Sequence, residues 1–181
     1  MIKKTDFENA KAITLQYFSK AGIVISEQEK NNIEVADFGL NRLNEIGLEI
    51  LVYVNTERCC AKELVLFPYQ ICPEHLHPSV NGLPGKEETF RCRYGRVFLY
   101  VDGKETENIS ARIPGDKQAS FTVKHEIILN PGDQYTLLPG TLHWFQAGPE
   151  GAVVSEFSTR SSDEYDFFTD QEIKRLPEVE E

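Results

Sequence analysis

The sequence is poor in cysteine. It contains four, Cys59, Cys60, Cys72 and Cys92, and no two of them stand in C-x-x-C spacing. Adjacent residues such as Cys59 and Cys60 are poorly placed to bridge each other, because a disulfide requires a particular separation of Cα and Cβ atoms. This composition argues against a disulfide-stabilised secreted domain. We therefore expect the chain to reside in the reducing cytoplasm.

Long apolar runs and excess basic charge are also missing. No uninterrupted apolar stretch approaches the roughly 18 residues that cross a bilayer, and no apolar run follows the N-terminal lysines. We therefore expect neither an export signal nor a membrane span. The 19 basic and 29 acidic residues give a formal net charge of −10, which repels a phosphate backbone. Neither a membrane nor a nucleic acid is expected as a partner.

The length of 181 residues, with 40% hydrophobic residues, suffices to bury one good core. We expect a single domain that spans 1–181. It comprises a helical flank over 1–47, a β-barrel over 48–160 and a tail over 161–181. The front of the tail carries aromatic residues and is expected to pack, whereas its acidic end is expected to fray.

The flank is predicted to be helical. Apolar residues over 6–21 recur at helical spacing, and Gly22 suits the left-handed residue that follows a helix. Ser26 and Glu29 have the spacing of a capping box. The apolar residues of 35–46 again recur at helical spacing, so a further helix is predicted there.

From residue 48 onward the pattern is typical of β-strands. Short runs rich in β-branched and aromatic residues are separated by turn sequences such as Asp-Gly and Asn-Pro-Gly-Asp. The runs are LEILVYVN, KELVLFPYQI, TFRCRY, RVFLYV, SFTVKHEIIL, QYTLL, HWFQA and AVVSEFS. Because no helix is predicted between them, they favour a mainly β fold, an antiparallel sandwich or jelly roll.

A metal site is predicted within 74–95, EHLHPSVNGLPGKEETFRCRYG. Side chains at i and i+2 of an extended chain leave the same face, so His75 and His77 project together, about 7 Å apart at the backbone. The prolines and glycines of 78–85 rule out a continuing helix or central strand and predict a loop that returns Glu88 to the two histidines. We expect this loop to lie at the barrel mouth, as a mobile lid.

The fourth candidate ligand is His143, in the last predicted hairpin. If residues 148–151 form the tip of that hairpin, antiparallel register places His143 opposite Glu156, on the same face and with Cβ atoms about 5 Å apart. His125 has no partner at metal-ligand spacing and is left out. Three imidazoles and one carboxylate suit Mn²⁺, Fe²⁺, Co²⁺, Ni²⁺ or Zn²⁺, and ligand type alone does not select among them.

The spacing of these residues resembles the two signature motifs of the cupin superfamily: His75-x-His77, then Glu88 and Gly95, and a distant His143 after Pro139. Two departures are visible. The insert between the second histidine and the glutamate is longer than in the general pattern, and Pro-Gly-Thr-Leu-His is one residue shorter than usual between proline and histidine.

The resemblance is more specific over residues 71–170. EHLHPSVNGLPGKEETFRCRYG, TLHWFQAGPEGAVVSEFSTRS and DFFTD are similar to segments of the D-lyxose ketol-isomerase family of metal-dependent cupins. This resemblance implies a cupin-type jelly-roll barrel, a homodimer and Mn²⁺ as the cofactor. It also implies a monosaccharide substrate, with reversible interconversion of D-lyxose and D-xylulose, commonly with D-mannose and D-fructose as a second pair.

Such an isomerisation needs a metal ion bound to both sugar oxygens and a base near the transferred proton. Glu156 is the candidate base, with a role in orienting the metal ligand as the alternative. Lys86 is expected to bind a substrate oxygen or stabilise an enediolate. Phe145 is expected to line the pocket floor and Trp144 to pack outside the barrel. Arg160 continues the inward parity of the last strand and is expected to grip sugar hydroxyls.

Two other classes of function remain open. The same ligands would serve another cupin enzyme, either a phosphosugar isomerase, which needs cationic residues at the pocket mouth, or an iron-dependent dioxygenase. A non-catalytic sugar-binding cupin would need neither Glu156 nor a metal. Metal analysis followed by incubation with D-lyxose separates these alternatives.

Overall fold

The computed structural model describes residues 1–176 and 178–180. The first element is one long helix, α1, over Lys4–Lys20. This helix ends close to the predicted residue because Gly22 adopts a positive φ of 71°. The buried face of α1 repeats at helical spacing: Ala10, Thr14, Tyr17 and Phe18. No helix in the described part of the chain is both long and apolar enough to cross a membrane.

The prediction of a helix over 35–46 is wrong. The capping box is present, since the Ser26 hydroxyl accepts from the amide of Glu29 and the Glu29 carboxylate accepts from the amide of Ser26. However, this box begins the short helix α2, over Glu27–Asn31. The capping signal therefore marks a real helix start, but the helix that begins there ends before the predicted range.

The apolar residues after α2 serve two cores instead of one helix face. Residues Glu34–Ala36 form the strand β1, and 37–46 form turns. Val35 packs in the core beneath α1, whereas Ala36 faces the barrel interior. Successive residues of a strand point to opposite faces, so this short strand fills both cores at once.

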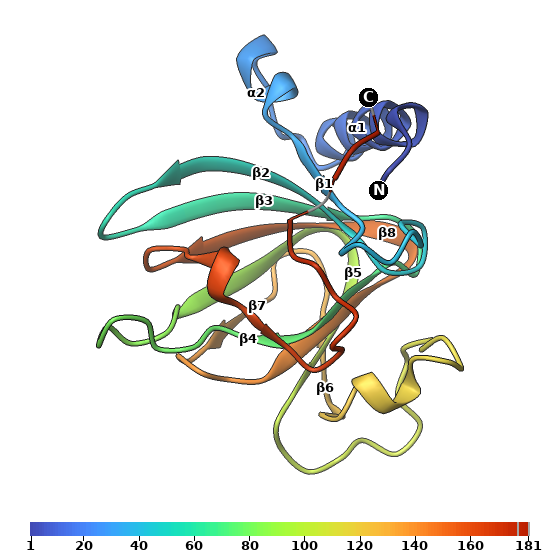
Figure 1. The fold of residues 1–181 in the computed structure, drawn as a ribbon. Coiled ribbons are helices and arrows are strands. Elements are labelled where there is room, and N and C mark those ends of the chain that lie inside the picture. Colours follow the sequence, from blue (N-terminus) through green and yellow to red (C-terminus); the bar gives the residue numbers. More distant parts are fainter. Residues whose placement is uncertain (177, 181) are drawn as a thin grey trace.

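The remainder is β-rich, as predicted. The strands are β2 (Leu48–Asn55), β3 (Cys60–Leu66), β4 (Ile71–Leu76), β5 (Glu88–Val101), β6 (His125–Leu129), β7 (Gln134–Leu137), β8 (His143–Ser158) and β9 (Phe167–Phe168), with short 3-10 turns η1 (Gln118–Ser120) and η2 (Asp163–Tyr165). All the strand pairings are antiparallel. The strands curl around a common interior (Figure 1). The predicted mainly β, cupin-type barrel is confirmed.

The central strand is β8. On one edge, β5 pairs with nearly its whole length, from Glu88 opposite Ser158 to Val101 opposite His143. On the other edge, β3 pairs with the C-terminal half of β8, and β4 pairs with the N-terminal half. The outer strands extend these pairs: β2 lies beside β3 and β1 beside β2, β9 lies beside β4, and β6 and β7 lie beside β5. The two halves of β5 and β8 thus belong to two different layers.

Both long strands are irregular at their middle. The β5–β8 ladder shifts register between Gly95 and Val97, and residues 148–151 of β8 stand outside the pairing with β5. Gly95 and Gly151 adopt positive φ angles of 72° and 74°, and a Cβ on Gly95 would lie 1.9 Å from the carbonyl oxygen of Gly151. Bulges of this kind bend and twist the strands. The two ends of each strand therefore face each other across the interior.

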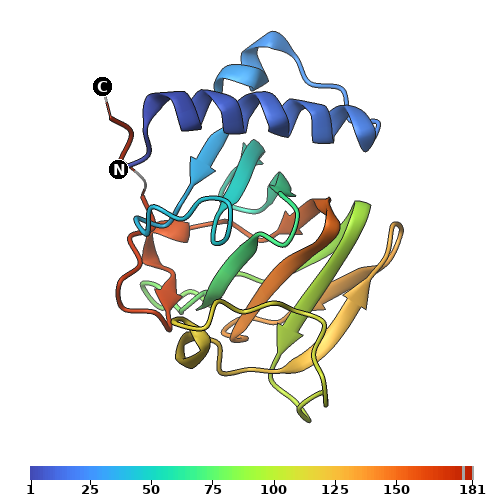
Figure 2. The ribbon, with the colours of Figure 1, turned by 90° about the vertical axis from the view of Figure 1, so that its right-hand side faces the viewer.

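Three apolar cores stabilise this arrangement. The largest fills the barrel interior, a second lies beneath α1, and a third lies outside the barrel beneath the segment 102–124. In both ribbon views α1 lies above the strands and the yellow 102–124 segment lies below them (Figures 1 and 2). Trp144 packs outside the barrel as expected, but it is fully buried there against Tyr100 and Phe121.

The C-terminal segment, 161–176, crosses the front of the barrel (Figure 1). Within it, β9 pairs with β4, and Phe168 packs against the interior core. The acidic end was expected to fray, and two of its described residues contact the N-terminus. Val179 forms a parallel bridge with Ile2, and the amide of Glu180 donates to the carbonyl of Ile2.

Candidate metal centre and active site

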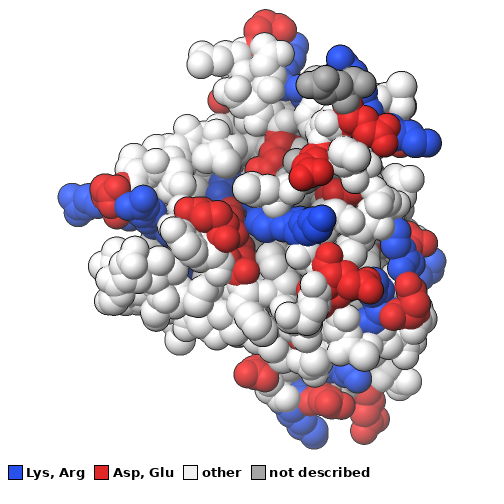
Figure 3. Space-filling view, in the orientation of Figure 1, with Lys and Arg blue, Asp and Glu red and all other residues white. Residues whose placement is uncertain are grey.

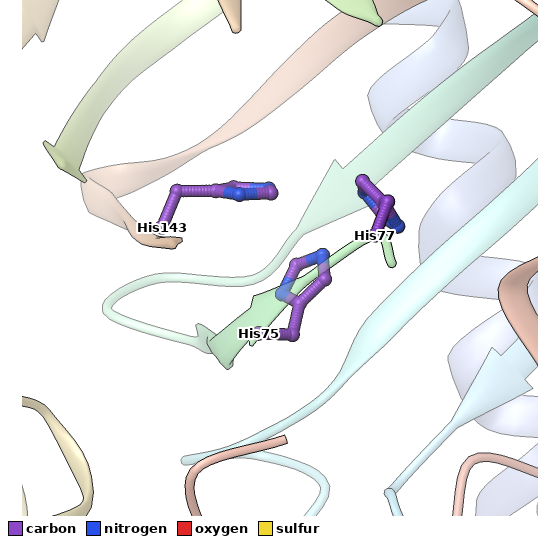
Figure 4. Close-up of side chains that lie close together, drawn as sticks. All are labelled: His75, His77 and His143. Atoms are coloured by element: carbon purple, nitrogen blue, oxygen red, sulfur yellow. The ribbon is translucent and has the colours of Figure 1, made fainter. Parts of the chain in front are cut away.

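Three histidines converge inside the barrel. His75 lies on β4, His77 directly follows β4, and His143 begins β8. One ring nitrogen of each lies within 4.8 Å of one from each of the others. Figure 4 shows the three imidazole rings turned toward one another from these two strands. All three are buried, with exposed fractions of 7% or less, so the group could hold a metal ion.

Backbone carbonyls fix two of these rings. The Nδ1 atom of His75 donates to the carbonyl of Pro73 at 2.8 Å, and that of His143 donates to the carbonyl of Thr141 at 3.0 Å. Burial and the two neighbouring histidines lower the pKa of His75 well below its usual range. A neutral ring with its proton on Nδ1 presents the lone pair of Nε2, which is the form that binds a metal ion.

His77 is fixed by a carboxylate. Its Nδ1 donates to Asp166 at 2.5 Å, and its Nε2 lies 3.0 Å from Oε1 of Glu88. Burial lowers the pKa of His77, but Glu88 and Asp166 outweigh burial and raise it to about 9. A carboxylate that accepts a hydrogen bond from the outer nitrogen of a histidine is a common partner of a metal-binding imidazole.

Glu88, the first residue of β5, lies beside two of the three histidines. Its Oε1 lies 3.0 Å from Nε2 of His77 and 3.1 Å from Nε2 of His143. Its Oε2 lies 2.8 Å from the ammonium of Lys86. Burial alone would raise the pKa of Glu88, but Lys86 and His77 outweigh it and hold the pKa well below its usual range. The residue is therefore an ionised carboxylate in contact with two of the three imidazoles.

A divalent ion fits this donor set. The buried Nε2 atom of His143 has no well-aligned hydrogen-bond partner among the described residues, although Glu88 lies 3.1 Å away. A buried nitrogen lone pair without a donor is costly in a folded protein unless a metal ion or a water satisfies it. Three imidazoles and one carboxylate with oriented outer nitrogens therefore suit a transition-metal ion.

Lys86 lies beside the candidate metal ligands, of which it contacts Glu88. Although β5 begins only at Glu88, the Lys86 side chain is 7% exposed and lines the interior cavity. Its ammonium contacts three carboxylates: Glu88 at 2.8 Å, Glu156 at 3.1 Å and Asp163 at 3.4 Å. Burial lowers the pKa of Lys86, but Glu156 and Glu88 outweigh burial and raise it well above its usual range. The side chain is a buried cation and not a solvated one.

Glu156 reaches the cavity by a different route from the predicted one. The prediction of a hairpin with its tip at 148–151 is wrong, because β8 is one continuous strand with a bulge at these residues. Glu156 pairs with Lys62 and Phe90, whereas His143 pairs with His75 at the other end of the strand. The curl of β8 brings both residues to the same interior, and Lys86 connects Glu156 to the metal cluster.

Four charged residues of the interior were not predicted from the sequence: Lys62, Asp163, Asp166 and Arg175. The ammonium of Lys62 lies 2.5 Å from Asp163 and 3.7 Å from Glu156. Alternation along β3 places Lys62 on the same face as two buried leucines. This pattern is visible in the sequence and could have indicated that Lys62 faces the interior. The other three lie on the C-terminal segment, where no periodicity indicates which side chains turn inward.

A second group of candidate ligands, His77, Asp163 and Asp166, also lies within 4.8 Å. However, Asp163 already faces two ammonium groups. Burial alone would raise the pKa of Asp163, but Lys86 and Lys62 outweigh it and hold the pKa well below its usual range. These cations neutralise the position that a second metal ion would need, so one metal site is the better interpretation.

Phe145 lines the interior cavity and packs edge-on against Phe90, with ring centroids 5.0 Å apart. Arg160 does not continue the inward parity that the sequence suggested. The strand β8 ends at Ser158, and the exposed guanidinium of Arg160 forms an ion pair with Glu57 at 2.5 Å. Arg160 thus borders an outer groove at the mouth, not the interior cavity.

The interior cavity is small, about 40 Å³. This volume accommodates only about three water molecules, since each water needs roughly 10–15 Å³. Residues of the C-terminal segment cover the cavity, namely Asp163, Asp166, Phe168 and Arg175. On this face, acidic and basic side chains are interspersed around the centre (Figure 3).

The family model for D-lyxose isomerase matches residues 19–181 of the sequence. The chain belongs to the D-lyxose isomerase family. Its relatives in this family include the D-lyxose/D-mannose isomerase of Thermosediminibacter oceani, 61% identical over 181 residues and the full length of both chains. The D-lyxose ketol-isomerase of Cohnella laeviribosi is 54% identical over 99% of this chain and 98% of the relative.

Solved structures place this D-lyxose isomerase family member in a known fold. The L-ribose isomerase of Acinetobacter sp. DL28, in complex with L-ribose, covers 95% of this chain and 94% of its own, with a TM-score of 0.78 and 16% identity. The ligand-free L-ribose isomerase of Cellulomonas parahominis matches with a TM-score of 0.76 and 15% identity, over 94% and 93% of the two chains. At this identity the likeness shows the fold alone.

Proposed function

We propose that this chain is a metal-dependent aldose–ketose isomerase that interconverts D-lyxose with D-xylulose and D-mannose with D-fructose. Its membership of the D-lyxose isomerase family supports the choice of sugars. The observation that carries the mechanism is the contact between two clusters: the metal cluster of His75, His77, His143 and Glu88 adjoins the Lys86–Glu156 ion pair. A sugar held at this junction meets both a metal ion and a base.

We assign the metal to these three histidines and Glu88, with Mn²⁺ as the ion that the family resemblance implies. Co²⁺, Fe²⁺, Ni²⁺ and Zn²⁺ share the same ligand preferences. When bound, a divalent ion would supply Lewis-acid stabilisation at the two oxygens of the open-chain sugar. Pro73 and Thr141, through their carbonyls, and Asp166 hold the rings so that the inner nitrogens point to the ion.

Glu156 is the proposed base, which takes the proton from C2 of the aldose and returns it to C1. It lies in the interior outside the group of three histidines. Among the described residues no hydrogen bond reaches its Oε2, which is the oxygen we propose faces the substrate, whereas its Oε1 accepts from Ser158 at 3.2 Å. The ammonium groups of Lys86 and Lys62 lie 3.1 Å and 3.7 Å from that oxygen. They are placed to stabilise the negative charge of an enediolate as it develops.

Substrate entry requires a local opening. A cavity of about 40 Å³ is too small for a pentose, so the covering side chains must move apart when the sugar binds. The loop 78–85 and Arg160 border the outer groove next to this cover. We propose that 78–85 moves as a lid, that Phe145 forms the apolar floor, and that Arg160 contacts the sugar where it enters through the outer groove.

The phosphosugar alternative has less support. The inward cations, Lys62, Lys86 and Arg175, are each paired with acidic residues. A phosphate would have to displace these carboxylates, because the cavity holds both signs of charge together. A non-catalytic role would leave unexplained why Lys86 and Glu156 are buried beside the metal cluster.

Incubation of the Mn²⁺-loaded protein with D-lyxose tests the proposal, with D-xylulose as the readout. In D₂O, transfer of a proton by Glu156 introduces deuterium at C1 of the ketose when the base exchanges with solvent, whereas a hydride shift does not. Oxygen consumption would indicate a dioxygenase instead. If the metal-loaded protein forms no ketose from any pentose or hexose, the isomerase proposal fails.

We also propose a homodimer in the cytoplasm, on the basis of the family resemblance and the cysteine usage. All four cysteines are free thiols in the structure, and three of them are buried. Light scattering on the purified protein measures the assembly directly. A mass of one chain, at 20.6 kDa, would contradict the dimer.

A further inference from the structure

Glu74 is a buried carboxylate that the proposed chemistry does not use. It directly precedes the metal-ligand candidate His75 on β4, yet it is not part of the cavity lining, and its exposed fraction is 1%. Its side chain turns to the outer side of β4, where the segment around Thr122 packs. A buried charge without a catalytic role needs another explanation, because desolvation makes it costly.

Four hydrogen bonds converge on this carboxylate. From the 102–124 segment, the amide and hydroxyl of Thr122 donate at 2.6 Å and 2.8 Å, and the amide of Val123 donates at 2.9 Å. From the C-terminal segment, the hydroxyl of Thr169 donates at 2.7 Å. The Thr169 amide also donates to the backbone carbonyl of Glu74 at 3.1 Å. Glu74 thus joins two segments distant in sequence to one strand.

The C-terminal side of this junction leads to the metal cluster. Thr169 directly follows β9, which pairs with β4 through only two residue pairs. Such a short edge strand has few ladder bonds to fix its position. The same short stretch carries Asp166, which accepts a hydrogen bond from Nδ1 of His77 at 2.5 Å. The bonds from Thr169 to Glu74 therefore hold the stretch that carries Asp166 against β4.

We propose that Glu74 is a positioning residue for the metal centre, acting through Thr169 and Asp166 on His77. This inference rests on the proposed metal site. Loss of the anchor lets β9 shift, and the carboxylate of Asp166 then no longer holds the His77 ring in its metal-binding orientation. Loss of a carboxylate that contacts a metal-binding histidine, as Asp166 contacts His77, commonly changes metal affinity by about 10- to 100-fold.

Two threonines provide a matched pair for the test. The hydroxyls of Thr122 and Thr169 donate to the same oxygen, Oε1 of Glu74, at 2.8 Å and 2.7 Å. Thr122→Val and Thr169→Val therefore each remove one hydroxyl bond from the same acceptor. Only Thr169 connects to Asp166, whereas Thr122 lies in the segment that covers Trp144, whose ring nitrogen donates to Val123.

Competition titration of Mn²⁺ on the purified full chain measures the effect. We expect Thr169→Val to weaken Mn²⁺ binding by about tenfold and Thr122→Val to leave it within about twofold of wild type. Thr169→Ser, which keeps the hydroxyl, should restore the wild-type affinity. Equal losses in the two valine variants, or no loss in Thr169→Val, would overturn the positioning role, because both results describe a purely structural carboxylate.

The route through Asp166 has its own test. If Thr169 acts through Asp166, adding Thr169→Val to Asp166→Asn weakens Mn²⁺ binding no further, and the two losses are not additive. Additive losses would overturn that route. The Nδ1 proton of His77 in the NMR spectrum of the metal-free protein gives a second readout, which Thr169→Val should shift or broaden and Thr122→Val should not.

Failure of the metal site itself gives a different result. If the wild-type chain binds no Mn²⁺, or if His75→Ala binds it equally well, the proposed function fails together with this inference. If the wild type binds Mn²⁺ and loses it on His75→Ala, but Thr169→Val behaves like Thr122→Val, only the role of Glu74 fails.

Discussion

Glu88 and His143 stand at opposite ends of the β5–β8 ladder, yet Oε1 of Glu88 lies 3.1 Å from Nε2 of His143. A flat ladder would hold these residues far apart, since each residue pair advances about 3.3 Å. The contact exists because both strands bend at their middle, where Gly95 and Gly151 adopt positive φ angles. The proposed metal site thus depends on a backbone irregularity far from any of its candidate ligands.

Substitution of Gly95 by alanine should remove this bend. Gly95 and Gly82 both have positive φ, so Gly82→Ala serves as the control for backbone strain, of roughly 1–2 kcal/mol. A Cβ on Gly82 meets open space, whereas one on Gly95 meets the carbonyl oxygen of Gly151 at 1.9 Å. We expect Gly95→Ala to lose about 1–3 kcal/mol more in the free energy of unfolding, measured with urea. Equal losses would show that the bend tolerates a side chain.

Removal of a metal ligand should abolish binding and activity together. We expect His75→Ala and Glu88→Gln to purify without bound metal and to lose turnover, because each removes one inner donor. His125→Ala is the matched control, since His125 begins β6 and lies outside the cluster, where its Nδ1 donates to Lys104. Mass spectrometry of the metal content provides the measurement. A fully loaded, active Glu88→Gln protein would remove that glutamate from the ligand set.

Replacement of the proposed base should separate metal binding from catalysis. We expect Glu156→Gln to retain its metal and to lose turnover by about 100-fold or more, because the amide cannot accept the sugar proton. Glu87, which is exposed although its sequence neighbours Lys86 and Glu88 are buried, provides the control Glu87→Gln with unchanged turnover. Steady-state rates with D-lyxose and the metal content are measured on the same preparation. An active Glu156→Gln enzyme contradicts the assignment.

Stability should fall with rising pH because of Glu63. Burial raises the pKa of Glu63 to about 7, above the roughly 4.3 of an unfolded glutamate. Between these values the folded state binds more protons, so the free energy of unfolding decreases from about pH 4.3 to about pH 7 and then levels off. Glu63→Gln should remove that slope and gain about 1–2 kcal/mol at about pH 8. An unchanged slope in denaturant titrations would refute this interpretation.

The local parts of the site were predictable from the sequence. The i and i+2 spacing of His75 and His77 fixes their common direction, and the proline-rich insert fixes the return to Glu88. Register across the centre of β8 was not predictable. Gly-Pro-Glu-Gly has the composition of a hairpin tip, and only the pairing of β5 along the whole strand shows that it is a bulge.

The absence of a helix over 35–46 and the residues that cover the cavity could not be predicted from the sequence, for different physical reasons. Apolar residues at 35–46 match a helix by spacing, but tertiary packing on two opposite cores outweighs this local preference. Asp166 and Arg175 approach the cavity from the C-terminal segment, through contacts with residues that lie far away in the chain. Such contacts leave no periodic signal, so they were not found.

The central place of β8 also affects how the protein is made. β3, β4 and β5 all pair with β8, but β8 comes after them in the chain. During synthesis, the edges of these strands that pair with β8 remain unpaired until β8 has been made. Unpaired strand edges can pair with other chains and lead to aggregation. Pairing over long sequence separations also slows folding, because loop closure must come first. A newly made chain is therefore most vulnerable to aggregation in the interval before residues 143–158 leave the ribosome.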